Sequence, residues 1–123
     1  MLKESGERSL WDKDWNMVVD VGANAGDSVR VAIINTGIDR SHPDLQDNIV
    51  GGAYVYYDPS SPGGASLIEA DYDDTDGHGT KVAGVVCAVD KDPGAVGAAP
   101  HSGIFAIKLE SSFFLHPEVD ARY

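Results

Sequence analysis

The sequence predicts an α/β fold, a parallel sheet with a βαβ crossover, within a single domain of 123 residues. Residues 29–34, 49–57 and 103–109 are rich in β-branched, aromatic or other apolar side chains, which is typical of strands. Residues 77–89 carry alanine, valine and glycine at closely spaced positions, which indicates a helix packed tightly on a sheet. A strand, a helix and a further strand in this order indicate two parallel strands joined by a crossover.

The first strand gives the clearest signal. Residues 29–34 are nearly continuous in apolar side chains, as expected for a strand covered on both faces. Asn-Thr-Gly at residues 35–37 ends the strand with a sharp turn. Residues 41–45 then predict a single short helical turn or a capped loop.

The remaining elements follow in order along the chain. Residues 49–57 predict a second, weaker strand, whose glycines mark a bulge or a close backbone approach. We expect residues 58–77 to form one long connection, of a length that is usually functional or mobile. The helix after it ends at Asp-Lys-Asp-Pro-Gly, residues 90–94, and residues 103–109 form the third strand.

Charge and composition exclude several classes of function. The net charge is −11, with 20 acidic residues against 9 basic ones, which excludes nucleic acid and a polybasic membrane patch. No apolar run approaches the roughly 18 residues that a membrane span needs. Cys87 is the one cysteine, which excludes an intramolecular disulfide, and its apolar surroundings predict a small buried thiol.

Two segments place polar residues of catalytic type at the predicted strand and helix ends. Residues 33–39 read Ile-Ile-Asn-Thr-Gly-Ile-Asp, and His-Pro-Asp-Leu follows at residues 42–45. Residues 78–84 read His-Gly-Thr-Lys-Val-Ala-Gly, and Gly-Ala-Ala-Pro follows at residues 97–100. Open α/β sheets place ligands and chemistry at the carboxyl ends of strands and the amino ends of helices.

In these residues the sequence resembles the subtilisin-like serine proteases, the subtilases of peptidase S8 type. Their first motif is an apolar strand ending in Asp-Ser/Thr-Gly-Ile/Val, followed by His-Pro-Asp-Leu, and their second is His-Gly-Thr-His-Val-Ala-Gly. The resemblance covers about residues 29–109 and implies the amino-terminal part of the catalytic domain, a partial subtilisin-like fold. A polar lead-in precedes it at residues 1–28, where Trp11 and Trp15 are spaced for one helical turn, and a divergent tail follows at residues 110–123.

The resemblance implies roles for two residues. His78 matches the general base, which takes the proton of the nucleophile and returns it to the leaving amine. Asn35 stands at the position of the triad aspartate, which orients the histidine. A neutral amide does not stabilise the imidazolium as a carboxylate does, and it can also stabilise the wrong tautomer. In a serine protease triad, an Asp-to-Asn change lowers turnover about 10⁴-fold.

The nucleophile of the family lies in a Gly-Thr-Ser-Met-Ala segment, in the second half of a domain more than twice this length. No Gly-Thr-Ser and no Gly-x-Ser-x-Gly elbow occurs in the sequence. Ser111 and Ser112 are poor substitutes, because neither lies in a predicted strained turn with backbone donors nearby. We therefore expect a chain truncated before the nucleophile and inactive alone, with one apolar sheet face uncovered and its substrate-binding residues unknown.

The acidic residues raise the question of calcium. One cluster does not follow the spacing of an EF-hand loop; its members are Glu69, Asp71, Asp73, Asp74 and Asp76. The resemblance points instead to Asp44, whose family counterpart often ligates calcium together with the loop that ends the motif helix. Here that loop carries Lys91, whose ammonium opposes a cation. The resemblance requires no cofactor, and calcium at Asp44 is the one metal that it suggests.

The resemblance implies a serine endopeptidase that acts on protein or peptide substrates, with the carboxyl-terminal half of the domain as the partner that completes it. Two alternatives stay open. One is a non-catalytic module that holds a peptide or a protease at the surface around His78 and Asn35, and the other is a calcium-responsive acidic domain. Subtilases are often secreted, whereas residues 1–10 show no signal-peptide pattern, so the compartment is not predicted.

Overall fold

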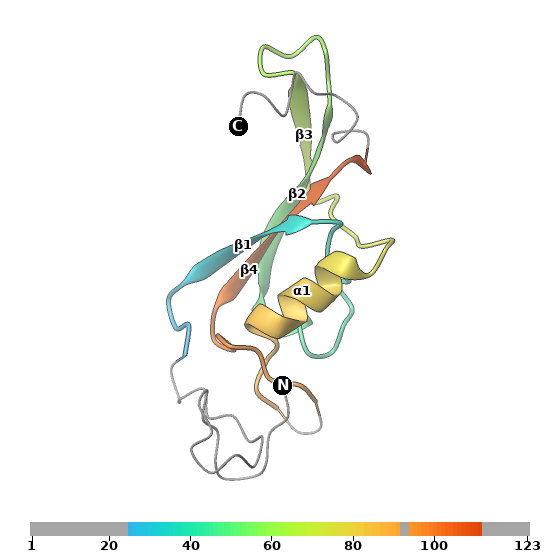
Figure 1. The fold of residues 1–123 in the computed structure, drawn as a ribbon. Helices are drawn as coiled ribbons and strands as arrows, with labels where there is room; N and C mark the ends of the chain where they lie inside the picture. Colours follow the sequence, from blue (N-terminus) through green and yellow to red (C-terminus); the bar gives the residue numbers. More distant parts are fainter. Residues whose placement is uncertain (1–24, 92–93, 112–123) are drawn as a thin grey trace.

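The computed structural model describes residues 25–91 and 94–111, which form one sheet with a helix against it (Figure 1). Its elements in chain order are β1 (Arg30–Asn35), the 3-10 turn η1 (Gln46–Asn48), β2 (Ile49–Tyr57), β3 (Ala65–Glu69), α1 (His78–Cys87) and β4 (Gly103–Leu109). The predicted α/β class is confirmed, with a helix between the second and the last parallel strand. The predictions for residues 1–24, with Trp11 and Trp15, and for residues 112–123 lie outside the described residues.

β4, the last strand of the described residues, lies in the interior of the sheet. The strand order is β1-β4-β2-β3, so β4 separates β1 from β2. β4 runs parallel to β1, from Arg30↔Gly103 to Asn35↔Lys108, and parallel to β2. Because the three strands are parallel, their carboxyl ends meet at one edge of the sheet. Asn35 therefore lies beside the end of β4.

The expectation of a single loop over residues 58–77 is wrong, because β3 forms inside it. β3 pairs antiparallel with β2, from Ala53↔Glu69 to Tyr57↔Ala65. The turn between them is held by Asp58, whose carboxylate accepts hydrogen bonds from Ser60 and Ser66. A strand of five residues beside glycine and proline gives too short a periodic pattern to stand out from a loop.

α1 covers one face of the sheet and builds the core with it. Ile33 of β1 and Ile104 and Ala106 of β4 are buried against Ala83 and Cys87 of α1. The predicted burial of Cys87 is confirmed, and its thiol is not part of a disulfide. Within the described part of the chain, no helix is long and apolar enough to cross a membrane.

The first turn of α1 lies against the turn that follows β1. A Cβ atom added to Gly79 would lie 2.1 Å from the carbonyl oxygen of Gly37, so only glycine fits there. Gly37 itself has a φ of 109°, a conformation that side chains with a Cβ rarely adopt. Two glycines thus let the helix start approach the strand end, which brings the two sequence motifs together.

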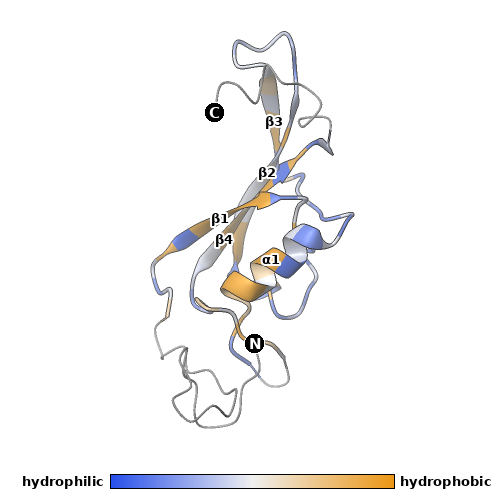
Figure 2. Cartoon of the chain, viewed as in Figure 1, coloured by the Kyte–Doolittle hydropathy of each residue, from blue (hydrophilic) through white to orange (hydrophobic). Residues whose placement is uncertain are grey.

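The opposite face of the sheet carries apolar side chains that no described residue covers. We call it the open face, and its large exposed residues are Ile34, Val50, Leu67 and Phe105, with exposed fractions of 59%, 54%, 59% and 40%. The register places Ile34 and Phe105 on one side, because Ala32 pairs with Phe105 and Ile34 with Ile107, opposite to the buried Ile33. Leu67 lies on the same side, because it pairs with Val55, which pairs with Leu109. Val50 lies there too, because its side chain is where a Cβ of Gly103 would point. Figure 2 shows the apolar colouring along β1 and β4. The expected uncovered apolar face is present among the described residues.

Candidate active site

The structure brings together the two residues that the motifs single out. Asn35 is the last residue of β1, and His78 is the first residue of α1. Their side chains meet across the close approach of the two elements, with 2.9 Å between the His78 Nδ1 and the Asn35 Oδ1 atoms. The His78 ring is exposed and Asn35 is half-buried. This is the geometry in which one side chain orients an imidazole for proton transfer.

The backbone decides which way the Asn35 amide points. The Thr36 N–H donates a hydrogen bond of 2.9 Å to Oδ1 of Asn35. A flipped amide would turn its NH₂ group toward this N–H and set two donors against each other. Oδ1 therefore accepts from both Thr36 and His78, and Nδ1 of the ring must carry a proton. In the neutral ring the lone pair is then on Nε2, the atom that a general base uses.

Three side chains satisfy the free N–H groups at the start of α1. The His78 N–H donates to the Asp76 carboxylate at 3.1 Å, the Gly79 N–H to the Thr36 hydroxyl at 2.9 Å, and the Thr80 N–H to the Asp74 carboxylate at 2.9 Å. The first N–H groups of a helix have no partner within the helix, so such caps fix where it begins. The position of His78 is set by this capping.

Asp74 has an unusual charge environment. Burial raises the pKa of Asp74, but hydrogen bonds from the Thr80 hydroxyl and from the N–H groups of Gly77, Thr80 and Asp76 outweigh it. The net pKa of Asp74 lies far below its ordinary value of 3.8. The carboxylate is therefore ionised at neutral pH beside the His78–Asn35 pair.

A pocket of about 320 Å³ opens beside the pair. It is lined by Ile34, Asn35, Thr36, His78, Leu109 and Ser111. Ile34 and Leu109 make its wall mostly apolar. Ser111 thus lies closer to the pair than the sequence suggested, but no hydrogen bond among the described residues joins its hydroxyl to His78.

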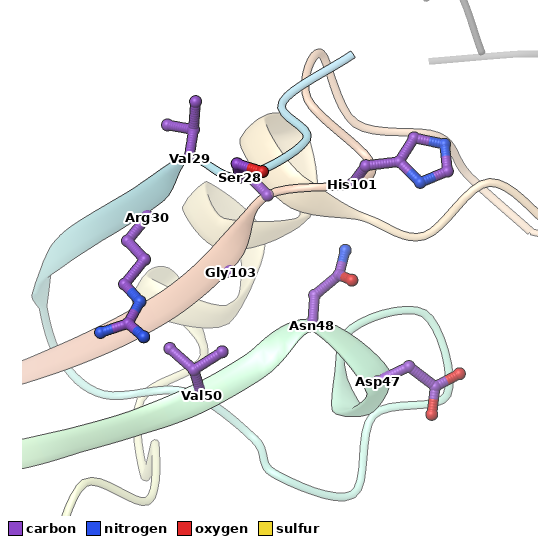
Figure 3. A pocket seen from close by; sticks show the side chains of 9 residues that line it. Ser28, Val29, Arg30, Asp47, Asn48, Val50, His101 and Gly103 are labelled. Atoms are coloured by element: carbon purple, nitrogen blue, oxygen red, sulfur yellow. The ribbon is translucent and has the colours of Figure 1, made fainter. Parts of the chain in front are cut away.

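A pocket of about 370 Å³ lies at the other end of the sheet (Figure 3). Its walls come from the starts of β1, β2 and β4, with His101 and Asn48 among the labelled side chains. Asn48 is committed to structure there, because its Nδ2 donates to the carbonyl oxygens of Cys87 and Pro100. The predicted catalytic residues lie at the carboxyl ends of the strands, so this pocket is separate from the candidate active site.

The structure describes part of the surroundings of Asp44, the residue for which the resemblance suggested calcium. Asp44 lies against the loop after α1, where its Oδ2 accepts a hydrogen bond of 3.4 Å from the Ala95 N–H. The Lys91 ammonium donates to the carbonyl oxygen of Pro43, the residue before Asp44. Calcium takes six to eight oxygen ligands, and calcium at Asp44 stays a prediction.

The acidic cluster is used within the protein. The Asp73 carboxylate pairs with the Arg40 guanidinium through two hydrogen bonds, of 2.7 and 2.6 Å, and Asp74 binds the start of α1. Nowhere among residues 25–91 and 94–111 do three or more His, Cys, Asp or Glu side chains gather in a way that could hold a metal ion.

A model of the subtilase family (peptidase S8) matches residues 26–121 of the chain. The chain belongs to the subtilase family. It is 40% identical over 87 residues to subtilisin of Bacillus pumilus, which covers 71% of this chain and 28% of that protein. It is 39% identical over 84 residues to the major intracellular serine protease of Bacillus subtilis (strain 168), covering 68% of this chain and 24% of that protein.

Solved structures agree with this assignment. The S41 psychrophilic protease matches with a TM-score of 0.56 and 28% identity, covering 68% of this chain and 26% of that one. Fervidolysin from Fervidobacterium pennivorans, a keratinolytic enzyme related to subtilisin, matches with a TM-score of 0.52 and 32% identity, covering 69% and 12%. The chain thus has a partial subtilisin-like fold, and it spans about a quarter of the length of the two curated relatives.

Sequence reasoning singled out His78 and Asn35 but missed the residues that hold them. Thr36, Asp74 and Thr80 surround the pair with hydrogen bonds. One signal was present, because an aspartate shortly before a helix start is a typical cap. The partnership with Thr36 was not visible, since Thr36 is 38 positions away from Asp74 in the sequence.

Proposed function

We propose that this chain provides the histidine and its orienting residue for serine-type hydrolysis of a protein or peptide. His78 acts as the general base through Nε2, and Asn35 holds its Nδ1–H. The observation that carries the proposal is the 2.9 Å contact between Nδ1 and Oδ1, with Oδ1 fixed by the Thr36 N–H. Nε2 then takes the proton of a nucleophile and returns it to the leaving amine.

Asn35 limits the rate of this chemistry. When Nε2 takes a proton the ring becomes an imidazolium, and a neutral amide 2.9 Å away offers no charge to stabilise it. We therefore propose that the substitution keeps the geometry of the pair and removes most of its catalytic power. The corresponding loss in a serine protease triad is about 10⁴-fold.

The nucleophile comes from outside the described residues in this proposal. Ser111 lines the pocket with His78, but its hydroxyl makes no hydrogen bond to the ring among the described contacts. A serine nucleophile requires such a contact to its base and a set of oxyanion donors. We propose that further subtilase polypeptide completes the site, and that this chain alone does not cut peptides.

Peptidase assays test the proposal in two steps. The chain alone is incubated with casein and with a fluorogenic peptide at neutral pH, where we expect no hydrolysis above that of a His78→Ala variant. It is then mixed with a separately produced carboxyl-terminal portion of the Bacillus pumilus subtilisin. We expect weak hydrolysis in the mixture, lost with His78→Ala and increased with Asn35→Asp.

Two outcomes would overturn the proposal that further subtilase polypeptide supplies the nucleophile. Turnover by the chain alone that disappears with Ser111→Ala would make Ser111 the nucleophile. No hydrolysis in the mixture, although the two parts bind each other, would rule out completion of the site in this way.

The pocket supports a second function, non-catalytic peptide binding. Ile34 and Leu109 give it an apolar wall next to the polar His78–Asn35 pair, as a site for an extended peptide requires. Fluorescence polarisation with labelled casein peptides measures such binding, and Leu109→Ser should weaken it while Val85→Ser, on the far side of α1, should not. Binding that is equal in both variants would exclude this pocket.

A further inference from the structure

We propose that Asp74 is a positioning residue for the His78–Asn35 pair, acting through two threonine hydroxyls that link the end of β1 to the start of α1. Its effect on hydrolysis rests on the proposed function, whereas its effect on the geometry of the His78 ring does not. The argument starts from the hydrogen bonds of its carboxylate.

The two oxygens of Asp74 serve different elements. Oδ1 accepts from the Thr36 hydroxyl at 2.9 Å and from the N–H groups of Gly77 at 2.8 Å and Asp76 at 3.0 Å. Oδ2 accepts from the N–H group of Thr80 at 2.9 Å and from its hydroxyl at 2.5 Å. One carboxylate therefore holds the residue after Asn35 and the residues on both sides of His78.

Each threonine hydroxyl also accepts a hydrogen bond from the other of the two elements, so that it links β1 and α1 as well as binding Asp74. A hydroxyl has one proton to donate, and both threonines donate it to Asp74, which leaves their oxygens to accept. The Thr36 oxygen accepts from the Gly79 N–H of α1 at 2.9 Å. The Thr80 oxygen accepts from the Asp39 N–H, in the segment after β1, at 3.0 Å. One bond runs from α1 to Thr36 and the other from the segment after β1 to Thr80. Together they fix the distance between α1 and the end of β1 and the rotation of one relative to the other.

The negative charge of Asp74 is essential to this arrangement. All five donors point at the carboxylate, and an ionised aspartate has only acceptors to offer them. An asparagine would keep one acceptor oxygen and turn its NH₂ group toward the donors that the other oxygen serves. The low pKa of Asp74 keeps its carboxylate ionised at neutral pH.

The arrangement explains how the pair keeps its geometry without an ion pair at position 35. Asn35 and His78 attract each other only as neutral groups, and His78 is exposed. Their contact is held by the elements that carry them, and Asp74 joins those elements beside the contact. Loss of Asp74 should therefore release the His78 ring while the core between α1 and the sheet persists.

NMR on the full chain tests this directly. Asp74→Asn is compared with Asp73→Asn, a matched control in which the neighbouring carboxylate loses only its exposed pair with Arg40. We expect the His78 ring of the native chain and of Asp73→Asn to carry its proton on Nδ1. In Asp74→Asn we expect a shift toward the Nε2–H tautomer, and amide exchange at Gly79 and Asp39 faster by roughly tenfold, as for one lost hydrogen bond.

A second pair of variants keeps the test decisive if Asp74→Asn does not fold. Thr36→Val removes one linking hydroxyl and should produce the same change in tautomer and in Gly79 exchange, whereas Thr36→Ser should restore both. An unchanged tautomer and unchanged exchange rates in a folded Asp74→Asn or Thr36→Val variant would overturn the proposal. Since no nucleophile is involved, failure of the hydrolysis assay leaves this result unaffected.

Discussion

At the scale of the residue, Asn35 contacts the His78 ring through a side chain that carries no charge. Its Oδ1 accepts from the Thr36 N–H and from the His78 ring, both at 2.9 Å. The sequence left both tautomers of His78 open, and the backbone N–H selects one of them. In the proposed function, the orientation and the charge stabilisation that an aspartate provides together are therefore separated.

We expect Asn35→Asp to move the Nδ1–H signal of the His78 ring downfield in the NMR spectrum. A carboxylate accepts a hydrogen bond from the ring more strongly than the present amide does at 2.9 Å. Asp73→Asn serves as the control for a change of one charge elsewhere on the surface. A signal that does not move in Asn35→Asp would mean that the two side chains are not in contact in solution.

Asp74 should make the stability of the chain depend on acid pH. Its pKa is lowered in the folded state relative to the ordinary value of 3.8, so the ionised form stabilises the fold above that value. This contribution is lost as the pH falls below 3.8 toward the folded-state pKa. Urea unfolding from pH 7 to pH 2 measures it. We expect the slope in the acid range to be smaller in Asp74→Asn, and an identical slope would contradict the contribution of Asp74.

At the scale of the element, the start of α1 depends on the absence of a side chain at Gly79. The carbonyl oxygen of Gly37 occupies the place where a Cβ would stand. Gly84, five residues further along the same helix, has no atom within 4 Å of the corresponding position. The same substitution should therefore have opposite effects at the two sites.

We expect Gly79→Ala to destabilise the fold by about 1–3 kcal/mol, the usual effect of forcing extra atoms into a packed site. Gly84→Ala should stabilise it by about 0.5–1 kcal/mol, since alanine loses less conformational entropy in a helix than glycine. Urea denaturation of both variants gives the comparison. If Gly79→Ala were as stable as Gly84→Ala, the close approach of α1 to β1 would not exist in solution.

The elements also show what could be predicted from sequence. The predicted strands at residues 49–57 and 103–109 coincide with β2 and β4, because their apolar residues are long, β-rich runs. β3 was missed because its stability comes from pairing with β2, and its own five residues carry little pattern. The motifs singled out His78 and Asn35, whose side chains the structure brings into contact, whereas Asp74 depends on contacts between distant segments that no local pattern reveals.

At the scale of the whole molecule, two properties oppose each other. The open face carries four exposed apolar side chains across all four strands, a surface that favours association. The net charge of −11 keeps copies of the chain apart while the salt concentration is low. Salt screens the charge and leaves the apolar face unaffected.

We expect the weight-average mass in sedimentation velocity to rise between about 0.02 M and about 0.5 M salt, where the screening length shortens from tens of ångströms to a few. Phe105→Ser should reduce this rise. Val85→Ser removes a more exposed apolar side chain from α1, on the other face, and should not reduce this rise. Equal behaviour of the two variants would exclude the open face as the contact.

The alternative of a calcium-responsive domain has a simple test. Asp44 is one carboxylate, and the Lys91 ammonium occupies the carbonyl oxygen of the preceding Pro43, so we expect millimolar calcium to leave the Tm unchanged relative to magnesium at equal ionic strength. A rise in Tm that is specific to calcium and lost in Asp44→Asn would contradict this expectation.

The place of β4 in the sheet has a consequence for folding during synthesis. β1 and β2 leave the ribosome first but do not touch each other, because β4 lies between them and pairs with both. Until Gly103–Leu109 has emerged, β2 and β3 are the only described strands that can pair with each other. The hairpin that they form is marginally stable in water on its own. β1 therefore stays without a partner strand in the nascent chain until β4 has been synthesised. Nascent chains on ribosomes stalled before and after β4 should differ sharply in protease resistance.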